Sequence, residues 1–274
     1  MIDKLFVAYK PTNISSNRFL SKIKKRYNIK KAGFSGTLDP FAKGVLIVAF
    51  GKYTKLFRFL KKTPKTYRAT LWLGAFSQSL DSENIAHIKI PKTYLKDEIK
   101  KAISSLKGDI TYLPPKYSAK KIDGKRAYIL AREGKDVDLK YITSRVYKAE
   151  LLHYKHPFIT FEITISEGGY IRSMAQIVCE KLNSIGTLCQ LERLSEGDFI
   201  YENEKELNPL DFLDLKENFY LKNIEDLKLG RKLIKENFKV QDAGSYFVKF
   251  GKIVSILEIK DDKVNYLLNG VNLC

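Results

Sequence analysis

The segment Gly33–Phe50, GFSGTLDPFAKGVLIVAF, constrains the fold of this 274-residue chain more than any other segment. It ends in VLIVAF, an apolar run that is too short to span a membrane and is typical of a strand buried on both faces. Three glycines, a proline and a single carboxylate, Asp39, precede the run. An Asp-Pro pair favours a turn. The segment alone therefore leaves two interpretations open: Asp39 shapes a turn that feeds a buried strand, or Asp39 is placed there to react.

Strand-like and helix-like stretches alternate through most of the chain, which predicts a mixed α/β protein. Helices are predicted from Ser15 or Ser16 to about Tyr27, and over YLKDEIKKAISSLKG and YIRSMAQIVCEKL. Gly33–Gly44 is predicted to be a loop. Strands are predicted over KLFVAYKP, VLIVAF and YRATLWLG, and a hairpin over YKAELLHY and FITFEITI.

Two changes in composition divide the chain. Between Leu113 and Lys140 it becomes basic and rich in turn residues, which indicates an insertion. Near Glu202–Leu210 an acidic, weakly patterned stretch precedes short alternating strands. We therefore predict one domain over residues 1–205, with an insertion at about 111–145, and a small β-rich domain over residues 210–274.

The charge balance indicates a polyanionic partner. Lys and Arg number 49 against 31 Asp and Glu, a formal net charge of +18. Such a surplus repels itself unless a partner compensates it, and nucleic acid is the commonest such partner. A solvated lysine-rich surface and a membrane surface remain as alternatives. No signal peptide is expected, and the three cysteines form no CxxC pair, as in reduced cytoplasmic proteins.

Several kinds of chemistry lack the residues they need. His153 and His156 are expected on opposite faces of strand ends, so no metal site is predicted. The sequence also contains no P-loop, no Gly-x-Ser-x-Gly elbow and no dinucleotide-binding fingerprint. What remains is a set of polar residues at predicted strand ends and turns, each of which alone is compatible with a structural role: Lys10, Asp39, Tyr67, Tyr170 and Arg172.

These residues lie in motifs that resemble the TruB family of tRNA pseudouridine synthases. The match runs from about residue 5 to residue 200, in the family's order and with similar spacing. After about residue 210 the resemblance rests only on position and β-like character. The motifs are KPTNISSN, AGFSGTLDPFAKGVLIVAFGKYTK, KTYRATLWLG, PPKYSAKKIDGKRAYILAREG, GGYIRS and LERL.

The resemblance implies a mixed, mainly antiparallel sheet flanked by helices, and a PUA-like C-terminal domain. It implies a tRNA pseudouridine synthase that needs no cofactor and acts on uridine 55 in the T-loop. Asp39 would be the catalytic carboxylate, Arg172 its ion-pair partner, and Tyr67 the platform for the flipped base and a candidate base for the C5 proton. Further substrate contacts would come from Lys10, Phe34, Tyr170 and Leu191.

The resemblance also implies how RNA is held. The basic insertion would close over the T-stem-loop, and the candidate RNA contacts are Lys55, Lys120, Lys121 and Arg126. The protein is expected to be a cytoplasmic monomer without metal or membrane partners. Two rival functions stay open: a relative that uses a guide RNA, and an RNA chaperone that folds tRNA.

Three positions depart from the family's pattern. Phe34 replaces the usual histidine, which removes a hydrogen-bonding group. Gly169 stands where threonine is common, and a looser turn before Tyr170 is expected. Glu192 stands where arginine is frequent, which removes a positive charge.

Overall fold

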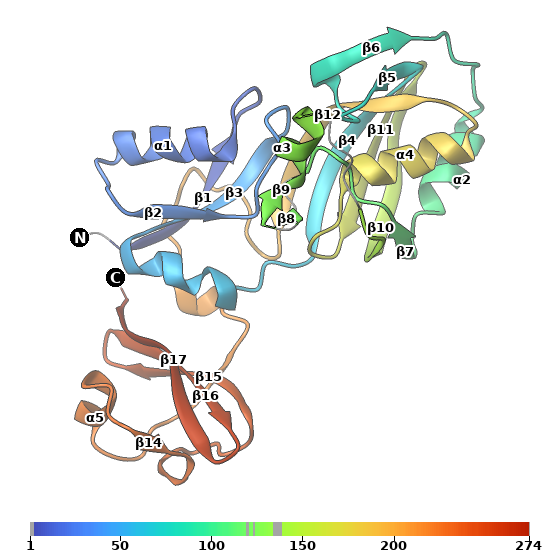
Figure 1. Ribbon diagram of the computed structural model, residues 1–274. Helices are drawn as coiled ribbons and strands as arrows, with labels where there is room; N and C mark the ends of the chain where they lie inside the picture. The colour runs from blue at the N-terminus through green and yellow to red at the C-terminus, as the bar shows by residue number, and fades with distance from the viewer. Residues whose placement is uncertain (1–2, 119–120, 123, 134–138, 274) are drawn as a thin grey trace.

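The computed structural model describes residues 3–118, 121–122, 124–133 and 139–273. Its main element is an eight-stranded sheet in the order β1-β3-β12-β4-β11-β10-β7, with β2 pairing on β3 (Figure 1). β12 pairs with β3 in parallel, and the remaining pairs are antiparallel. The predicted mixed, mainly antiparallel sheet is therefore confirmed. The strands are β1 Lys4–Lys10, β2 Ala32–Ser35, β3 Lys43–Phe50, β4 Lys65–Leu73, β7 Gly108–Tyr112, β10 Ile142–Lys155, β11 Phe158–Ile165 and β12 Gly186–Glu196.

Strand β3 is the buried strand that the apolar run predicted. Residues 44–50 are all buried, because both faces of β3 are covered. Helix α1 (Ser16–Arg26) packs on one face with Val48 and Phe50, while the 3₁₀ helix η1 (Gly51–Phe59) packs on the other with Val45 and Ile47. The predicted loop Gly33–Gly44 was too long, since β2 continues to Ser35 and β3 begins at Lys43. Pairing of β2 with β3 satisfies backbone groups that a loop would leave to water.

Helices α2 (Lys96–Ser104) and α4 (Ile171–Lys181) lie beside the other half of the sheet (Figure 1). Helix α4 buries a stripe at helical spacing that includes Ile171, Met174 and Val178, and this stripe packs on residues of β4 and β11. The helix was predicted to begin at Tyr170 and begins one residue later, at Ile171, and Arg172 lies in its first turn as the sequence predicted. The hairpin predicted around His156–Pro157 is formed by β10 and β11.

Two excursions lie near this half of the sheet. A hairpin made of β5 (Ala75–Ser77), η2 (Ser82–Asn84) and β6 (Ile85–Ile88) was not predicted. The basic insertion carries β8 (Lys121–Ile122), β9 (Lys125–Arg126) and α3 (Ala127–Arg132). In Figure 1 the insertion lies in front of the sheet, between α1 and α4.

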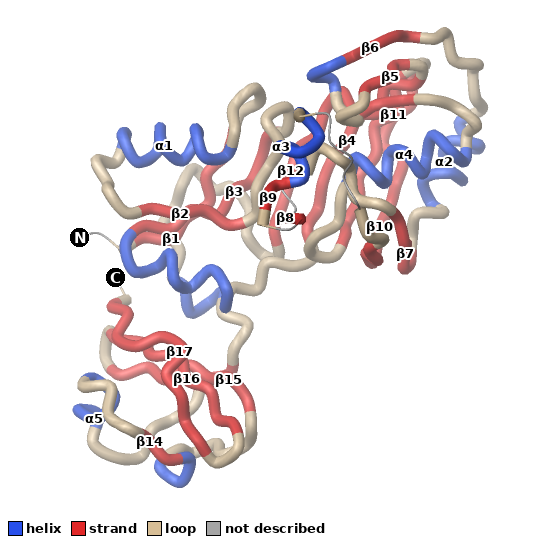
Figure 2. Tube along the Cα trace, viewed as in Figure 1, coloured by secondary structure: helices blue, strands red, loops and turns tan. Residues whose placement is uncertain are grey.

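The C-terminal region forms a separate five-stranded sheet in the order β13-β15-β16-β17-β14. Figure 2 shows its strands below the main sheet, with η1 between the two. Ile256, Leu268 and Val271 share a hydrophobic cluster with η1 and β1, while other residues form a core within the region itself. The elements are η3 Pro209–Phe212, β13 Lys216–Glu217, α5 Ile224–Lys228, β14 Leu233–Ile234, η4 Lys235–Asn237, β15 Gly244–Phe250, β16 Ile253–Lys260 and β17 Lys263–Asn272.

Within the described ranges, none of the helices combines the length and the apolar character that crossing a bilayer requires.

Candidate functional site

Asp39 lies in the loop between β2 and β3. The carbonyl of Asp39 accepts a hydrogen bond from the amide of Ala42 (3.1 Å), which closes a turn around Pro40. Gly36 and Gly44 flank this turn with φ of +68° and +114°. A Cβ at Gly44 would lie 2.2 Å from the carbonyl oxygen of Arg193, so only glycine fits there. The loop therefore presents Asp39 in one defined conformation.

Arg172 brings the loop and two other segments together. Its Nη2 lies 2.9 Å from Oδ2 of Asp39, and its Nη1 lies 3.6 Å from Oδ2 of Asp81. The guanidinium also donates to the carbonyls of Ser79 (2.7 Å) and Tyr117 (2.8 Å). Arg172 is only 3% exposed, and a charge so buried needs such partners. The predicted pairing of Asp39 with Arg172 is thus present in the geometry.

Asp81 is a site residue that the sequence reasoning missed. It is 5% exposed, and its Oδ1 accepts hydrogen bonds from Ser79 Oγ (2.6 Å) and from the amide of Glu83 (3.1 Å). Ser77 Oγ lies 2.9 Å from Ser79 Oγ and extends the chain of contacts. The available signal was the alternation of small polar residues in SQSLD, shortly after the strand β4.

The electrostatics of Asp39 reflect competing effects. Burial raises the pKa of the Asp39 carboxyl above its usual value, and the nearby carboxylate of Asp81 acts in the same direction. The charges of Arg172 and Lys10 oppose this rise. The Asp39 side chain still keeps 34% of its surface exposed, against 4% for Arg172. Asp39 therefore has a polar anchor on one side and access to the adjoining pocket on the other.

Lys10 lies beneath the same loop and is fully buried. Its Nζ donates to the carbonyls of Pro11 (2.9 Å), Ile14 (2.7 Å) and Pro40 (3.3 Å). Burial lowers the pKa of Lys10 to about 8. The sequence predicted a substrate contact here, and the structure places the ammonium among backbone carbonyls next to Asp39.

A second cluster of charges holds the two ends of the loop. The Arg193 guanidinium donates from Nη2 to the carbonyl of Gly36 (2.7 Å) and from Nε to that of Val45 (2.8 Å). Glu196 lies 3.3 Å from Arg193 and 3.3 Å from Lys65. Arg193 and Glu196 are 1% and 0% exposed, so this cluster is sealed from solvent.

The pocket beside Asp39 has a volume of about 850 Å³, within the usual range for ligand sites. Asp39, Asp81 and Arg172 line it together with Phe34, while Ser15–Asn17 form another part of its wall. Tyr67 (8% exposed) and Leu191 (7%) belong to the hydrophobic cluster that also contains Leu38, the residue before Asp39, and Tyr170 packs on that cluster.

The candidate RNA contacts lie elsewhere. Lys55 is exposed on η1, which flanks β2. Lys120 lies outside the described residues. Lys121 and Arg126 pair across β8 and β9 in the insertion, whose side chains at these positions are not described.

The three departures from the family's pattern have distinct surroundings. Phe34 lines the pocket and packs beside α1. A Cβ at Gly169 would lie 2.4 Å from Ile165 Cδ1, so the glycine permits close packing there. Glu192 accepts a hydrogen bond from the hydroxyl of Tyr9 (2.6 Å).

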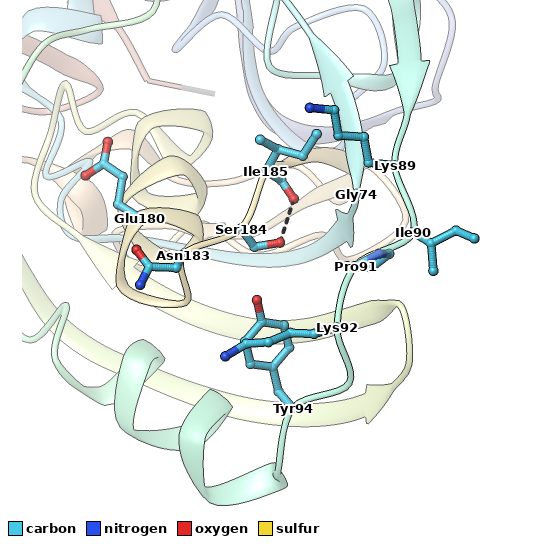
Figure 3. Close-up of a pocket in the computed structure, with 10 residues that line it drawn as sticks. All are labelled: Gly74, Lys89, Ile90, Pro91, Lys92, Tyr94, Glu180, Asn183, Ser184 and Ile185. Atoms are coloured by element: carbon cyan, nitrogen blue, oxygen red, sulfur yellow. Dashed lines mark hydrogen bonds between the residues drawn. The ribbon is translucent and has the colours of Figure 1, made fainter.

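A second hollow of about 720 Å³ lies between the segment after β6 and the end of α4 (Figure 3). Its lining includes Lys89, Lys92 and Glu180, and among the described residues Glu180 forms no ion pair with either lysine. The paired carboxylates and arginine that could support chemistry lie in the Asp39 pocket instead. Nor do three His, Cys, Asp or Glu side chains gather around a possible metal position anywhere in the described chain.

Comparison with known families and proteins agrees with the motifs. The family model for the TruB family pseudouridylate synthase N-terminal domain matches residues 24–171, more than half of the chain. A protein of Campylobacter jejuni subsp. jejuni serotype O:2 named tRNA pseudouridine synthase B is 52% identical over 273 residues and covers 100% of both chains. A protein of Nitratiruptor sp. with the same name is 53% identical over 270 residues and covers 98% of each.

Solved structures support the fold. The Cbf5-Nop10-Gar1 complex contains a chain that matches with a TM-score of 0.70 at 18% identity, over 98% of this chain and 84% of that one. An H/ACA RNP bound to a substrate RNA matches with a TM-score of 0.64 at 17% identity, over 98% and 84%. The motifs, the family model and the full-length relatives agree, and the chain belongs to the TruB family of pseudouridine synthases.

Proposed function

We propose that this tRNA pseudouridine synthase of the TruB family converts uridine 55 in the T-loop of tRNA to pseudouridine. The observation that carries the proposal is the Asp39 carboxylate, which is ion-paired to Arg172 at 2.9 Å and still exposed to the pocket. The relatives that match over their full length are named as tRNA pseudouridine synthases B.

The reaction is an isomerisation. The N1–C1′ bond of uridine breaks with its electron pair going to the uracil N1, the base turns, and a C5–C1′ bond forms. The proton at C5 is lost and N1 gains a proton, so there is no net oxidation or reduction. Positive charge develops at C1′ as the first bond breaks, and a carboxylate stabilises or traps such a centre, as in glycoside hydrolysis. Asp39 supplies that carboxylate.

Arg172 and Lys10 keep this carboxylate ionised. Both charges oppose the rise that burial imposes on the pKa of Asp39. Arg172 also fixes the carboxylate relative to α4, and Asp81 fixes Arg172 in turn. Positioning of this kind supplies much of an enzyme's rate enhancement.

The target base has to leave the RNA stack to reach Asp39. Tyr67 provides a platform for the flipped base, and stacking on an aromatic ring is worth about 1–3 kcal/mol per base. Tyr67 is also the candidate base for the C5 proton, which only its phenolate form could accept. Tyr170 and Leu191 contact the flipped base from the hydrophobic cluster beside the pocket. Phe34, which lines the pocket, stacks on it.

The basic insertion closes over the T-stem-loop with Lys120, Lys121 and Arg126, and Lys55 adds a phosphate contact from η1. Such contacts give affinity without reading sequence. The protein works as a monomer in the cytoplasm and needs no guide RNA.

The test uses unmodified tRNA transcripts and purified protein without guide RNA, with pseudouridine mapped by carbodiimide-dependent primer-extension stops. We expect a stop at position 55 with the wild type, and none with Asp39→Asn, which still binds tRNA. Absence of product at every uridine would overturn the proposal. Product only on addition of a guide RNA would favour the guide-dependent alternative, and tRNA folding without product would favour the chaperone.

A further inference from the structure

The N-terminal part of the chain carries an unusually one-sided charge. Residues 4–38 contain nine Lys and Arg residues and no Asp or Glu, although the whole chain has 31 carboxylates for 49 basic residues. Most of these basic residues lie on α1 or directly after it. They are Lys4, Lys10, Arg18, Lys22, Lys24, Lys25, Arg26, Lys30 and Lys31.

Helix α1 arranges three of these charges in one line. Arg18, Lys22 and Lys25 follow the spacing i, i+4 and i+7, and all three are exposed. Over this interval the helix rises about 10 Å. The opposite face, with Phe19 and Ile23, packs in the cluster formed with β1 and β3. The stripe is therefore held at a fixed place on the surface.

Among the described residues, no carboxylate pairs with the three charges of the stripe. Arg26 pairs with Glu204, and Lys10 is buried among carbonyls. In contrast, Arg18, Lys22 and Lys25 form no ion pair with any carboxylate in the part of the chain that the structure describes. The same holds for Lys30 and Lys31, which extend the stripe beyond the helix. Concentrated like charges without carboxylates repel one another, and a bound polyanion removes that cost.

Helix α1 is hydrogen-bonded directly to the loop that carries Asp39. Ser16 Oγ donates to the carbonyl of Leu38 and accepts from its amide, at 3.0 Å in each case. Ser15–Asn17, at the start of α1, line the Asp39 pocket. Figure 1 shows α1 and α4 on either side of the insertion, away from the C-terminal region. RNA that reaches Asp39 therefore passes close to α1.

The pocket itself offers little to phosphates. Arg172 is the one Lys or Arg residue in the described lining, and two carboxylates and two carbonyls already surround it. Phosphates that flank the reacting nucleotide must be neutralised outside the pocket, and α1 is the adjacent basic surface.

We propose that the stripe formed by Arg18, Lys22 and Lys25, extended by Lys30 and Lys31, binds the phosphate backbone of the tRNA outside the nucleotide held at Asp39. The inference rests on the proposed function, because it takes RNA as the substrate. Lys and Arg bind phosphates without reading sequence and release condensed counterions when they do so. An anionic membrane fits less well, because the apolar face of α1 is packed on the sheet and is not available for insertion.

The test removes the three charges of the stripe in one variant that carries Arg18→Gln, Lys22→Gln and Lys25→Gln. Glutamine is chosen because it retains a high helix propensity. The matched control is Lys96→Gln, Lys100→Gln and Lys101→Gln on α2, where Asp97 and Glu98 accompany the lysines. The Kd for an unmodified tRNA transcript is measured at several NaCl concentrations, and the pseudouridine-forming rate is measured in single turnover at saturating protein. Circular dichroism checks that α1 remains folded.

We expect the α1 variant to bind tRNA about tenfold more weakly or worse near 0.1 M salt, and the slope of log K against log salt to fall by about 2. The saturated rate and the α2 control should match the wild type. Unchanged affinity and slope in a folded α1 variant would overturn the inference, as would a loss confined to the saturated rate. A loss of binding to phosphatidylserine vesicles with tRNA binding intact would also overturn it. If the wild type formed no pseudouridine but the α1 variant still bound tRNA more weakly, the result would support the stripe as an RNA-binding surface and overturn the proposed function.

Discussion

Two arginine–carboxylate clusters hold the Asp39 loop, and they differ in access to solvent. In one, Arg172 joins Asp39 to Asp81, and the Asp39 side chain is 34% exposed. In the other, Arg193 joins Glu196, and both side chains are 1% exposed or less. The residue types are the same in both clusters. The difference is that the carboxylate of Asp39 faces a pocket, whereas that of Glu196 faces the side chains of Lys65 and Ser35.

The comparison separates chemistry from positioning. A sealed ion pair adds little net stability over an apolar pair, but its partners become costly once either is removed. Arg193 therefore fixes the ends of the loop at Gly36 and Val45, whereas Arg172 orients the one carboxylate that a substrate can reach. Substitutions in the two clusters test this division, and the largest effect is expected at Asp39.

Asp39→Asn should remove nearly all activity and leave the fold intact. We expect a loss of at least about 10³-fold in the rate of pseudouridine formation, as when other essential catalytic groups are removed. Because burial raises the pKa of Asp39, the native state binds more protons than the unfolded state between the two pKa values. Stability thus falls as pH rises through this window, because ionising the buried carboxyl costs stability. Thermal unfolding of Asp39→Asn should therefore occur at or above the wild-type temperature.

The exposed Asp97→Asn on α2 serves as the control for that variant. It should leave both the rate and the unfolding temperature unchanged. A clear drop in the unfolding temperature of Asp39→Asn would contradict the account of its electrostatics.

Arg193→Met should mainly lower the free energy of unfolding, whereas Asp39→Asn should mainly lower the rate. Removing one partner of a buried pair costs about 3–5 kcal/mol, since Glu196 is left with a buried, poorly compensated charge. Urea unfolding measures the loss. The control is Arg68→Met, because Arg68 is 48% exposed on its side chain and lies 4.0 Å from Glu162, and such pairs contribute about 0–1 kcal/mol. Equal losses in the two variants would show that the sealed cluster has no special role.

Asp81→Asn should act on the rate through Arg172. The amide retains an acceptor for Ser79 Oγ but loses the charge that holds Nη1 of Arg172. We expect a decrease of about 10²-fold in the single-turnover rate, the size that a small misplacement of a catalytic group produces. The Kd for tRNA should not change. A wild-type rate would remove Asp81 from the catalytic arrangement.

Removing the charge of Asp81 and removing the charge of Lys10 should shift the pH dependence of the rate in opposite directions. Ionised Asp39 is the active form, so the rate should fall as pH decreases through the raised pKa of Asp39. Asp81→Asn removes a carboxylate that raises this pKa, and the acid limb should move to lower pH. Lys10→Met removes a charge that lowers it, and the acid limb should move to higher pH. Single-turnover rates between about pH 4 and 8 measure both shifts, and shifts of the same sign would contradict the assignment.

Local patterns predicted the parts of the site that depend on neighbouring residues. The apolar run specified β3, and the spacing in YIRSMAQIVCEKL specified α4 with Arg172 in its first turn. The pairing of Arg172 with Asp39 followed from the family resemblance, since no pattern in the chain links positions so far apart.

Local sequence patterns could not predict partners that lie far apart in the chain. Arg172 and the Ser79 carbonyl are 93 positions apart, and Arg193 and the Gly36 carbonyl are 157 apart. Asp81 was missed for this reason, because its role appears only when the hairpin of β5 and β6 folds beside α4. Lys10 was predicted to contact substrate, but its Nζ is enclosed by the carbonyls of Pro11 and Ile14, directly after β1, and by that of Pro40, 30 positions away.

The central claim is that Asp39 performs the chemistry and the sealed Arg193–Glu196 cluster only positions it. The most direct measurement is the single-turnover release of tritium from tRNA labelled at C5 of uridine, with saturating Asp39→Asn whose tRNA affinity has been verified. The account predicts release at least about 10³-fold slower than with the wild type. Release within a few-fold of the wild-type rate would contradict it.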